Sequence, residues 1–170
     1  MKLTKIFLAI VAFCTLSCGE VVGPQPPTTP GNGSFVDDSG IVWEGNGVIV
    51  GQWSLTSYGY PVQPQIYVEF CEDGTFSLYQ RFTDIAWVSY KGSYSLSGNI
   101  LTGKYSDGTP LTGYKVSYGK KDNLRHILLA SQENEAYMQI YEECEIPTYI
   151  IEEAKSGTKA VRSAEFVPVL

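Results

Sequence analysis

The chain has a single histidine, which limits the metal sites and catalytic sites that it could form. His126 lies in the apolar run from Leu124 to Leu128, in phase with both leucines, and the sequence contains no other histidine. A multi-histidine metal site within one chain is therefore excluded. No nucleophile-elbow motif accompanies this residue, so a histidine-based catalytic triad is not expected either. The pattern predicts a partly buried structural histidine.

The acidic residues offer little more for catalysis. Glu69, Asp73, Glu142 and Glu143 lie at the ends or on the polar face of segments that we expect to be strands. Hydrolysis of a glycosidic bond needs two carboxylates held across a cleft, and this spacing predicts solvated acids instead. No glycine-rich phosphate loop precedes a helix. We therefore expect no enzyme, no metal and no cofactor.

Aromatic side chains are the one set of residues that suggests a binding surface. Trp87, Tyr90 and Tyr94 follow one another within a single expected strand. An aromatic wall with a few polar groups suits a small apolar ligand inside a barrel. These three residues are the candidate ligand-binding residues, and packing of the core is the alternative role for each of them.

The charge balance argues against nucleic acid as a partner. The full sequence carries a formal charge of −6, and removal of residues 1–17 leaves 10 basic and 18 acidic side chains, a charge of −8. A phosphate backbone requires a basic stripe. The basic residues here are scattered along the chain, apart from Lys120 and Lys121. No nucleic-acid partner is expected.

The first residues have the pattern of an export signal. Lys2 and Lys5 precede an almost wholly apolar run from Ile6 to Leu16, and small residues follow from Ser17. A short basic start, an apolar run of about ten residues and small residues at the cleavage site are typical of a signal peptide. The run is too short to span a bilayer as a stable anchor. We predict that residues 1–17 are removed.

The end of this signal, Thr15-Leu16-Ser17-Cys18, resembles the lipobox of bacterial lipoproteins. In that family the cysteine receives diacylglycerol before cleavage and becomes the new N-terminus, and Cys18 holds that position. Family members usually carry Leu three residues before the cysteine, where this chain has Thr15. The resemblance implies a membrane anchor with fatty-acyl chains such as palmitate. An ordinary secretory signal that is cleaved nearby is the alternative.

The same resemblance implies a place in the cell envelope. Lipoproteins that stay in the inner membrane carry Asp directly after the cysteine, whereas this chain has Gly19. The sequence therefore permits delivery to the outer membrane, on its periplasmic or its surface side. Residues 18–45 are the expected tether, because prolines between Pro24 and Pro30 lie among Gly, Thr and Asn with little to bury. Proline-rich segments extend by about 3 Å per residue.

The chain from Gly51 to about Cys144 consists of short segments of alternating apolar character, separated by turn residues. Twelve Tyr and seventeen Gly favour strands and tight turns over helices. The alternation predicts eight strands, near residues 51–58, 65–71, 75–82, 85–96, 100–106, 112–118, 124–131 and 136–143.

Two of the expected hairpins have a defined register. Glu72-Asp73-Gly74 is a three-residue loop with Gly74 in the left-handed conformation, and Gly98-Asn99 is a two-residue turn. With these loops the apolar residues of both strands share one face, whereas a shift by one residue would scatter them. The predicted pairs are Phe70 with Phe76, Val68 with Leu78, and Leu96 with Leu101.

Eight sequential strands with short connections predict an all-β fold. Closure into an antiparallel up-and-down barrel over residues 46–146 protects the sheet edges, and a β-sandwich is the alternative. Residues 147–170 follow the barrel. Pro147 can occupy the first turn of a short helix, which we predict from Tyr149 to Lys155. The tail after this helix has no assigned role.

Two cysteines remain in the expected domain. Cys71 and Cys144 both lie near strand ends, and an oxidising compartment would allow them to pair. The second and eighth strands of a closed barrel flank the first strand without touching each other, so a disulfide needs favourable geometry at the strand ends. A disulfide and two free thiols both remain open.

Gly51-Gln52-Trp53 at the start of the first expected strand resembles the Gly-x-Trp motif that opens the first strand of lipocalins. The resemblance implies that Gly51 and Trp53 close one end of a lipocalin-like barrel. The barrel topology and the aromatic residues together predict binding of a small hydrophobic or amphipathic ligand without catalysis, and the lipid anchor at Cys18 makes the membrane a partner. The alternative is an interaction or inhibitor module for a protein of the envelope, with a barrel interior filled by side chains.

Overall fold

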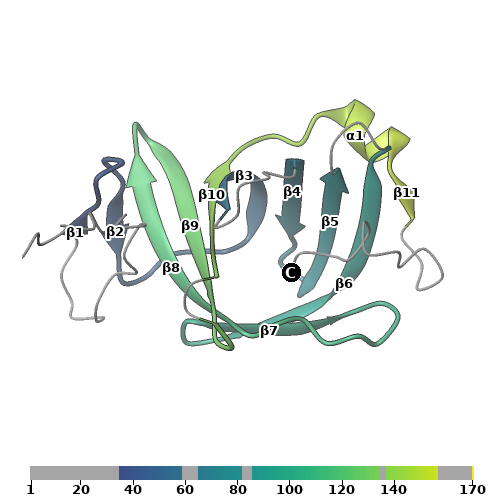
Figure 1. Cartoon of the computed structure of the whole chain (residues 1–170), viewed down its shortest axis with the longest axis horizontal. Coiled ribbons are helices and arrows are strands. Elements are labelled where there is room, and N and C mark those ends of the chain that lie inside the picture. The colour runs from purple at the N-terminus through teal and green to yellow at the C-terminus, as the bar shows by residue number, and fades with distance from the viewer. Residues whose placement is uncertain (1–34, 59–64, 82–85, 135–136, 157–169) are drawn as a thin grey trace, which may run out of the picture.

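The computed structural model describes residues 35–58, 65–81, 86–134, 137–156 and residue 170. Within these residues the chain forms strands around one common interior, and a short helix lies outside them (Figure 1). The eight principal strands are β3 (Gly51–Tyr58), β4 (Gln65–Phe70), β5 (Thr75–Arg81), β6 (Val88–Ser97), β7 (Ile100–Tyr105), β8 (Tyr114–Lys121), β9 (Leu124–Ser131) and β10 (Met138–Glu143).

Each of these strands pairs antiparallel with the next, and the last pairs with the first. β10 lies against β3 from the pair Gln139–Tyr58 to the pair Glu143–Trp53, with an irregularity between Ile140 and Tyr141. The predicted eight-stranded antiparallel up-and-down barrel is confirmed. The sandwich alternative is wrong, because one continuous sheet closes on itself.

Both predicted hairpin registers are confirmed. The pairs between β4 and β5 include Phe70 with Phe76 and Val68 with Leu78. Gly74 has a φ of 79°, as the three-residue loop requires. The pairs between β6 and β7 include Leu96 with Leu101, so local turn chemistry and burial of one face set the register together.

The contact between β7 and β8 is much shorter than the other contacts of the barrel. Only Ile100 with Lys115 and Leu101 with Tyr114 are paired there. Beyond this contact, the connecting segment folds back along β7, where the Leu111 amide donates to the Gly103 carbonyl at 2.9 Å. The connecting segment thus supplies hydrogen-bond partners to the part of β7 that does not pair with β8.

A small hairpin of β1 (Phe35–Val36) and β2 (Val42–Glu44) covers the other part of the β8 edge. β2 pairs with β8, with Trp43 opposite Gly119. Trp43 is buried, and a Cβ atom at position 119 would lie 2.8 Å from its ring. This corrects the prediction that the tether reaches residue 45. Trp43 buries apolar surface against the outer face of β8, and its indole N–H donates to Asp37 at 2.7 Å.

The C-terminal helix lies on the outside of the barrel. α1 (Thr148–Glu153) starts directly after Pro147, two residues short of the predicted end at Lys155. Its Ile150 is fully buried in a cluster with Tyr79 and Trp87. β11 (Lys155–Ser156) follows and pairs in parallel with the first residues of β6. In the described part of the chain we find no helix with the length and apolar character that a membrane crossing requires.

Candidate functional site

The interior of the barrel is lined by a row of aromatic rings from four neighbouring strands. Phe70 of β4 and Phe76 of β5 lie with ring centres 6.3 Å apart, and Phe76 meets Tyr105 of β7 edge-on at 5.6 Å. Tyr90 of β6 contacts Tyr105 at 6.1 Å, and Tyr94 of β6 contacts Phe70 at 5.0 Å. Such tilted and edge-on pairs are favourable ring arrangements. We call these five residues the aromatic belt.

Strand alternation and one glycine position the belt. Every second residue of β4, β5 and β6 points inward, and the residues between them face outward. Gly92 lies opposite Phe76 in the β5–β6 pair. A Cβ atom at position 92 would collide with the Phe76 ring and with the Lys104 carbonyl oxygen. The missing side chain therefore leaves the space that the Phe76 ring occupies.

Polar groups are set among these apolar walls. Gln139 of β10 is fully buried and accepts a hydrogen bond from the Tyr141 hydroxyl at 2.5 Å. Burial raises the pKa of Tyr114 to about 12, against smaller effects of its hydrogen bonds to Thr112 and Gln139. The Tyr118 hydroxyl is buried and has no hydrogen-bond partner among the described residues. The interior is thus apolar in its walls but carries neutral donors and acceptors.

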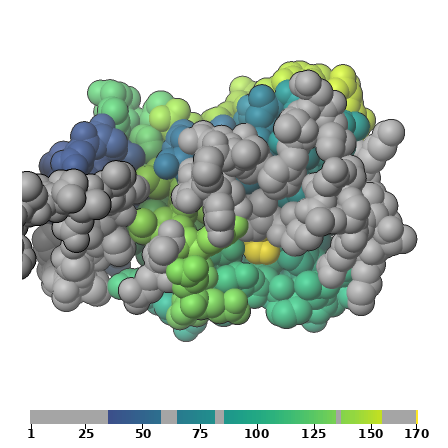
Figure 2. All heavy atoms as spheres, viewed as in Figure 1, coloured from purple at the N-terminus to yellow at the C-terminus, as the bar shows by residue number. Residues whose placement is uncertain are grey.

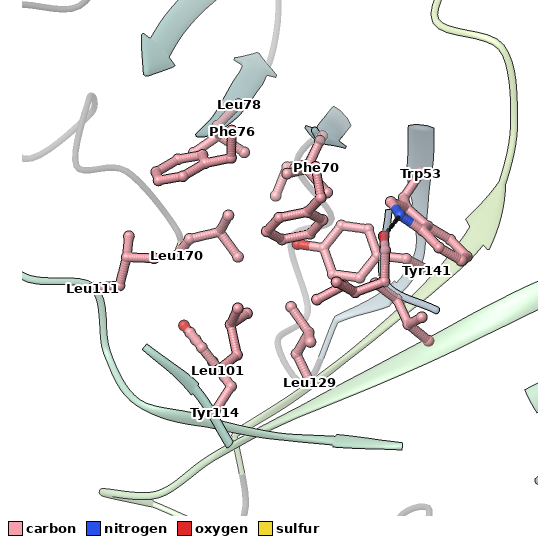
Figure 3. Packing of buried hydrophobic residues seen from close by; sticks show 14 of the residues in the cluster. Trp53, Phe70, Phe76, Leu78, Leu101, Leu111, Tyr114, Leu129, Tyr141 and Leu170 are labelled. Atoms are coloured by element: carbon pink, nitrogen blue, oxygen red, sulfur yellow. Dashed lines mark hydrogen bonds between the residues drawn. The ribbon is translucent and has the colours of Figure 1, made fainter. Parts of the chain in front are cut away.

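One end of the barrel is sealed around Trp53, and we call it the Trp53 end. Trp53 is fully buried and its indole N–H donates to the Ile49 carbonyl at 2.8 Å (Figure 3). The Arg125 guanidinium lies over the indole ring, 5.1 Å from its centre. Gly51 has a φ of 143°, and a Cβ atom there would lie 2.9 Å from Arg125 Nη2. The motif therefore needs its glycine both for backbone conformation and for space.

Arg125 also ties this end together electrostatically. It donates two hydrogen bonds to Glu143, at 2.9 Å from Nε and 2.6 Å from Nη2. The guanidinium holds the pKa of Glu143 below its ordinary value, against a smaller opposite effect of burial. Weaker bonds reach the Val48 and Val50 carbonyls at 3.3 to 3.4 Å. The sequence interpretation placed Glu143 among solvated acids at strand ends; it is the last residue of β10 and 35% exposed, but its pairing with Arg125 was not predicted.

The structure brings together two of the three candidate ligand-binding residues. Tyr90 and Tyr94 belong to the aromatic belt, and the Tyr94 hydroxyl donates to the Cys71 carbonyl at 2.7 Å. Trp87 lies apart from them, buried in the outer cluster beneath α1. The Arg81 guanidinium lies 4.9 Å from the centre of its ring. Any ligand role of these residues stays a prediction, with Trp87 on a different surface from the other two.

The histidine and the cysteines have structural surroundings. His126 is 4% exposed, with Nε2 3.2 Å from a Glu142 carboxylate oxygen, so the predicted burial is confirmed. Cys71 and Cys144 are free in the structure, and burial raises the pKa of the Cys144 thiol to about 11. No group of acidic, histidine or cysteine side chains that could hold a metal ion occurs in the described ranges. Cys18 lies outside them.

Sequence reasoning missed two residues of the interior and its seal. Arg125 is the second residue of β9, the strand beside the one that pairs with β3, and this adjacency is the signal that could have singled it out. Leu170 belonged to a tail without an assigned role, yet it is 5% exposed within the interior cluster. The stretch Ala164 to Leu170 is largely apolar, but it has no periodic pattern that predicts such a position for Leu170.

We predict that Arg125→Ala destabilises the domain by about 1 kcal/mol at pH 7, because it removes the cation–π contact and the Glu143 pair from a half-exposed site. The folded-state pKa of Glu143 is depressed, so the contribution of the pair is present above the ordinary pKa of 4.5. It is lost as the pH falls through the lower folded value. Thermal unfolding followed by circular dichroism should therefore show a smaller loss of stability on acidification in the variant.

Lys115→Ala is the matched control, since Lys115 is an exposed cation on the barrel wall. We expect its unfolding temperature to follow that of the wild type at every pH. Equal stability of the Arg125 and Lys115 variants at pH 7 would contradict a sealing role for the guanidinium.

The comparison with protein families agrees with this geometry. The model of a lipocalin-like domain matches residues 49–125, which span the Trp53 motif, the aromatic belt and Arg125. No curated protein matches the chain. The matched segment supplies strands β3 to β8, and the remaining two strands close the sheet. Over residues 49–125 the chain therefore matches a lipocalin-like domain, and its strands form a closed eight-stranded antiparallel barrel.

Proposed function

We propose that this chain is a lipid-anchored protein of the cell envelope whose barrel binds a small hydrophobic or amphipathic ligand without catalysis. The observation that carries the binding function is the aromatic belt, a continuous apolar wall inside a lipocalin-like barrel. Ligand sites of this kind combine apolar walls with a few fixed polar groups. The belt and the neutral polar groups beside it have this composition.

The polar groups of the interior narrow the ligand class. The buried polar side chains of the described residues are Gln80, His126, Ser131 and Gln139. His126 alternates with the inward-facing Ile127 and Leu129 of β9, so it faces outward, where it pairs with Glu142. None of the others carries a formal charge. A buried ion without a partner is very costly, so the ligand that fits best has a neutral head group, such as an ester, an alcohol or a ketone.

The Tyr118 hydroxyl is the polar contact that we assign to such a head group. It has no partner among the described residues, and a buried donor that stays unsatisfied costs about 1–3 kcal/mol. A ligand oxygen that accepts its hydrogen bond would recover this cost. Tyr118 belongs to the same interior cluster as the belt residues Phe76 and Tyr105.

We predict that the protein binds N-phenyl-1-naphthylamine, a neutral apolar probe, with a rise in probe fluorescence, and that monoolein displaces it. Tyr118→Phe should leave probe binding unchanged and weaken monoolein about fivefold, because one neutral hydrogen bond contributes about 1 kcal/mol. Tyr149→Phe is the matched control, since Tyr149 is 54% exposed on α1. Fluorescence titration measures both affinities.

Two results would count against this function. A wild-type protein that neither binds the probe nor retains a lipid in native mass spectrometry after purification from its own membrane would contradict binding. Binding of monoolein that is equal in the wild type and in Tyr118→Phe would remove the Tyr118 hydroxyl from the site.

A second function is favoured by how tightly the interior is packed. Large side chains such as Trp53, Phe70 and Phe76 are fully buried there, so the barrel could instead be a rigid support for an interaction surface. Tyr149 and Ile151 on α1 are the exposed apolar residues nearest to the outer cluster around Ile150. An interior that admits no probe and a co-purifying envelope protein would favour this alternative.

The lipid anchor is supported by the position of Cys18. It follows the apolar run of the N-terminus in a Thr15-Leu16-Ser17-Cys18 sequence that is similar to a lipobox. The first described strand begins at Phe35, which leaves a proline-rich stretch between the acylation site and the domain. We place the anchored domain at the outer membrane, because Gly19 is not the Asp that retains lipoproteins in the inner membrane.

We predict that Cys18→Ser abolishes incorporation of an alkyne-labelled palmitate in a bacterial host, because no thiol is left to be acylated at the processing site. Cys14→Ser, within the apolar run, is the matched control and should be labelled like the wild type. In-gel fluorescence after click chemistry measures the label. Labelling that persists in Cys18→Ser at the wild-type level would exclude Cys18 as the lipidated residue.

A further inference from the structure

Leu170 lies inside the barrel although it is far along the chain from every strand that surrounds it. Its side chain is 5% exposed and belongs to the same interior cluster as the aromatic belt. The end of the chain is marked within the ring of strands in Figure 1, and a small group of yellow atoms at the end of the colour scale is visible from the same side in Figure 2. Leu170 is therefore a part of the interior contents.

The contacts of Leu170 combine an alkyl group with an oxygen acceptor. Figure 3 shows its side chain among Phe76, Leu101 and Leu111, with which it shares the cluster. Its backbone oxygen accepts a hydrogen bond from the Tyr105 hydroxyl at 2.5 Å. Tyr105 is itself held by edge-on contacts to Phe76 and Tyr90. Two chemically different contacts thus fix one small aliphatic residue at the centre of the belt.

An acyl ligand would make the same two kinds of contact. It has an aliphatic chain for the belt and, beside the chain, a carbonyl oxygen that can accept from Tyr105. A tyrosine hydroxyl has one hydrogen to donate, and packed interiors have no room for two occupants of one position. Leu170 and an acyl group would therefore exclude each other.

We propose that Leu170 is a built-in competitor that occupies the acyl-binding position of the barrel, and that an acyl ligand binds only when it displaces Leu170. This inference rests on the proposed binding function and adds the ligand class and its regulation. The measured affinity of the ligand is then reduced by the fraction of molecules in which Leu170 is in place. A substitution that weakens the contacts of Leu170 with the aromatic belt should therefore increase the affinity for the ligand.

The test compares monoolein binding by the full chain with and without the Leu170 side chain. We expect Leu170→Ala to bind monoolein at least about threefold tighter than the wild type, because more molecules are free of the competitor. Ile151→Ala is the matched control, since Ile151 is an aliphatic residue that is 44% exposed on α1. Its affinity for monoolein should equal that of the wild type.

A second measurement follows Leu170 itself. Its methyl groups, labelled with ¹³C and assigned by comparison with Leu170→Ala, lie among aromatic rings and should resonate away from random-coil positions. Monoolein should move them to random-coil positions as it binds. Tyr105→Phe should shift them partly in that direction without any ligand, because the hydroxyl that holds the Leu170 backbone is gone.

The outcomes separate this inference from the proposed function. If monoolein binds the wild type and Leu170→Ala equally well and the Leu170 methyl resonances do not move, the competitor is excluded while the binding function stands. If neither protein binds monoolein or the naphthylamine probe, the proposed function fails and the competitor role fails with it. Tighter binding by Leu170→Ala together with ligand-induced release of the methyl groups supports the proposal.

Discussion

The pairing of β10 with β3 is the interaction on which the rest of the molecule depends. An open eight-stranded sheet would leave two rows of unpaired backbone groups, and closure satisfies both rows at once. The Cys144 amide extends the seam beyond the strand by donating to the Gln52 carbonyl at 3.0 Å. The Gln52 side chain continues it, because its amide oxygen accepts from the Ile146 amide at 2.8 Å. The same seam therefore leads the chain from the barrel to the helix outside it.

Closure also gives the interior its chemical character. Inward-facing residues of all eight strands meet in one enclosed space, so each polar group there must find a partner or remain unsatisfied. The Trp53 end is sealed by Arg125, which combines a ring contact with a paired carboxylate. The belt side is apolar, and Tyr105 holds the Leu170 backbone there.

Local patterns in the sequence were sufficient for most of the fold. The β4–β5 and β6–β7 hairpins follow from turn residues and from alternation, because neighbours in sequence are also neighbours in the sheet. The β2–β8 contact could not be predicted, since Trp43 packs on Gly119 through a long-range pairing in a stretch whose composition is that of a tether. The interior residues divide in the same way. Tyr90 and Tyr94 could be identified from the sequence by residue type, whereas the positions of Arg125 and Leu170 depend on closure of the barrel and were not predicted.

Amide hydrogen exchange of β3 and β10 tests closure of the barrel most directly. If the seam is intact, the paired amides of both strands should exchange only through global unfolding, with the same protection as the amides of β4 and β5. The account predicts equal opening free energies for the four strands, within the error of the measurement. Amides of β10 that exchange at the rate of an exposed loop, while β4 and β5 stay protected, would show an open sheet and would contradict the closed barrel.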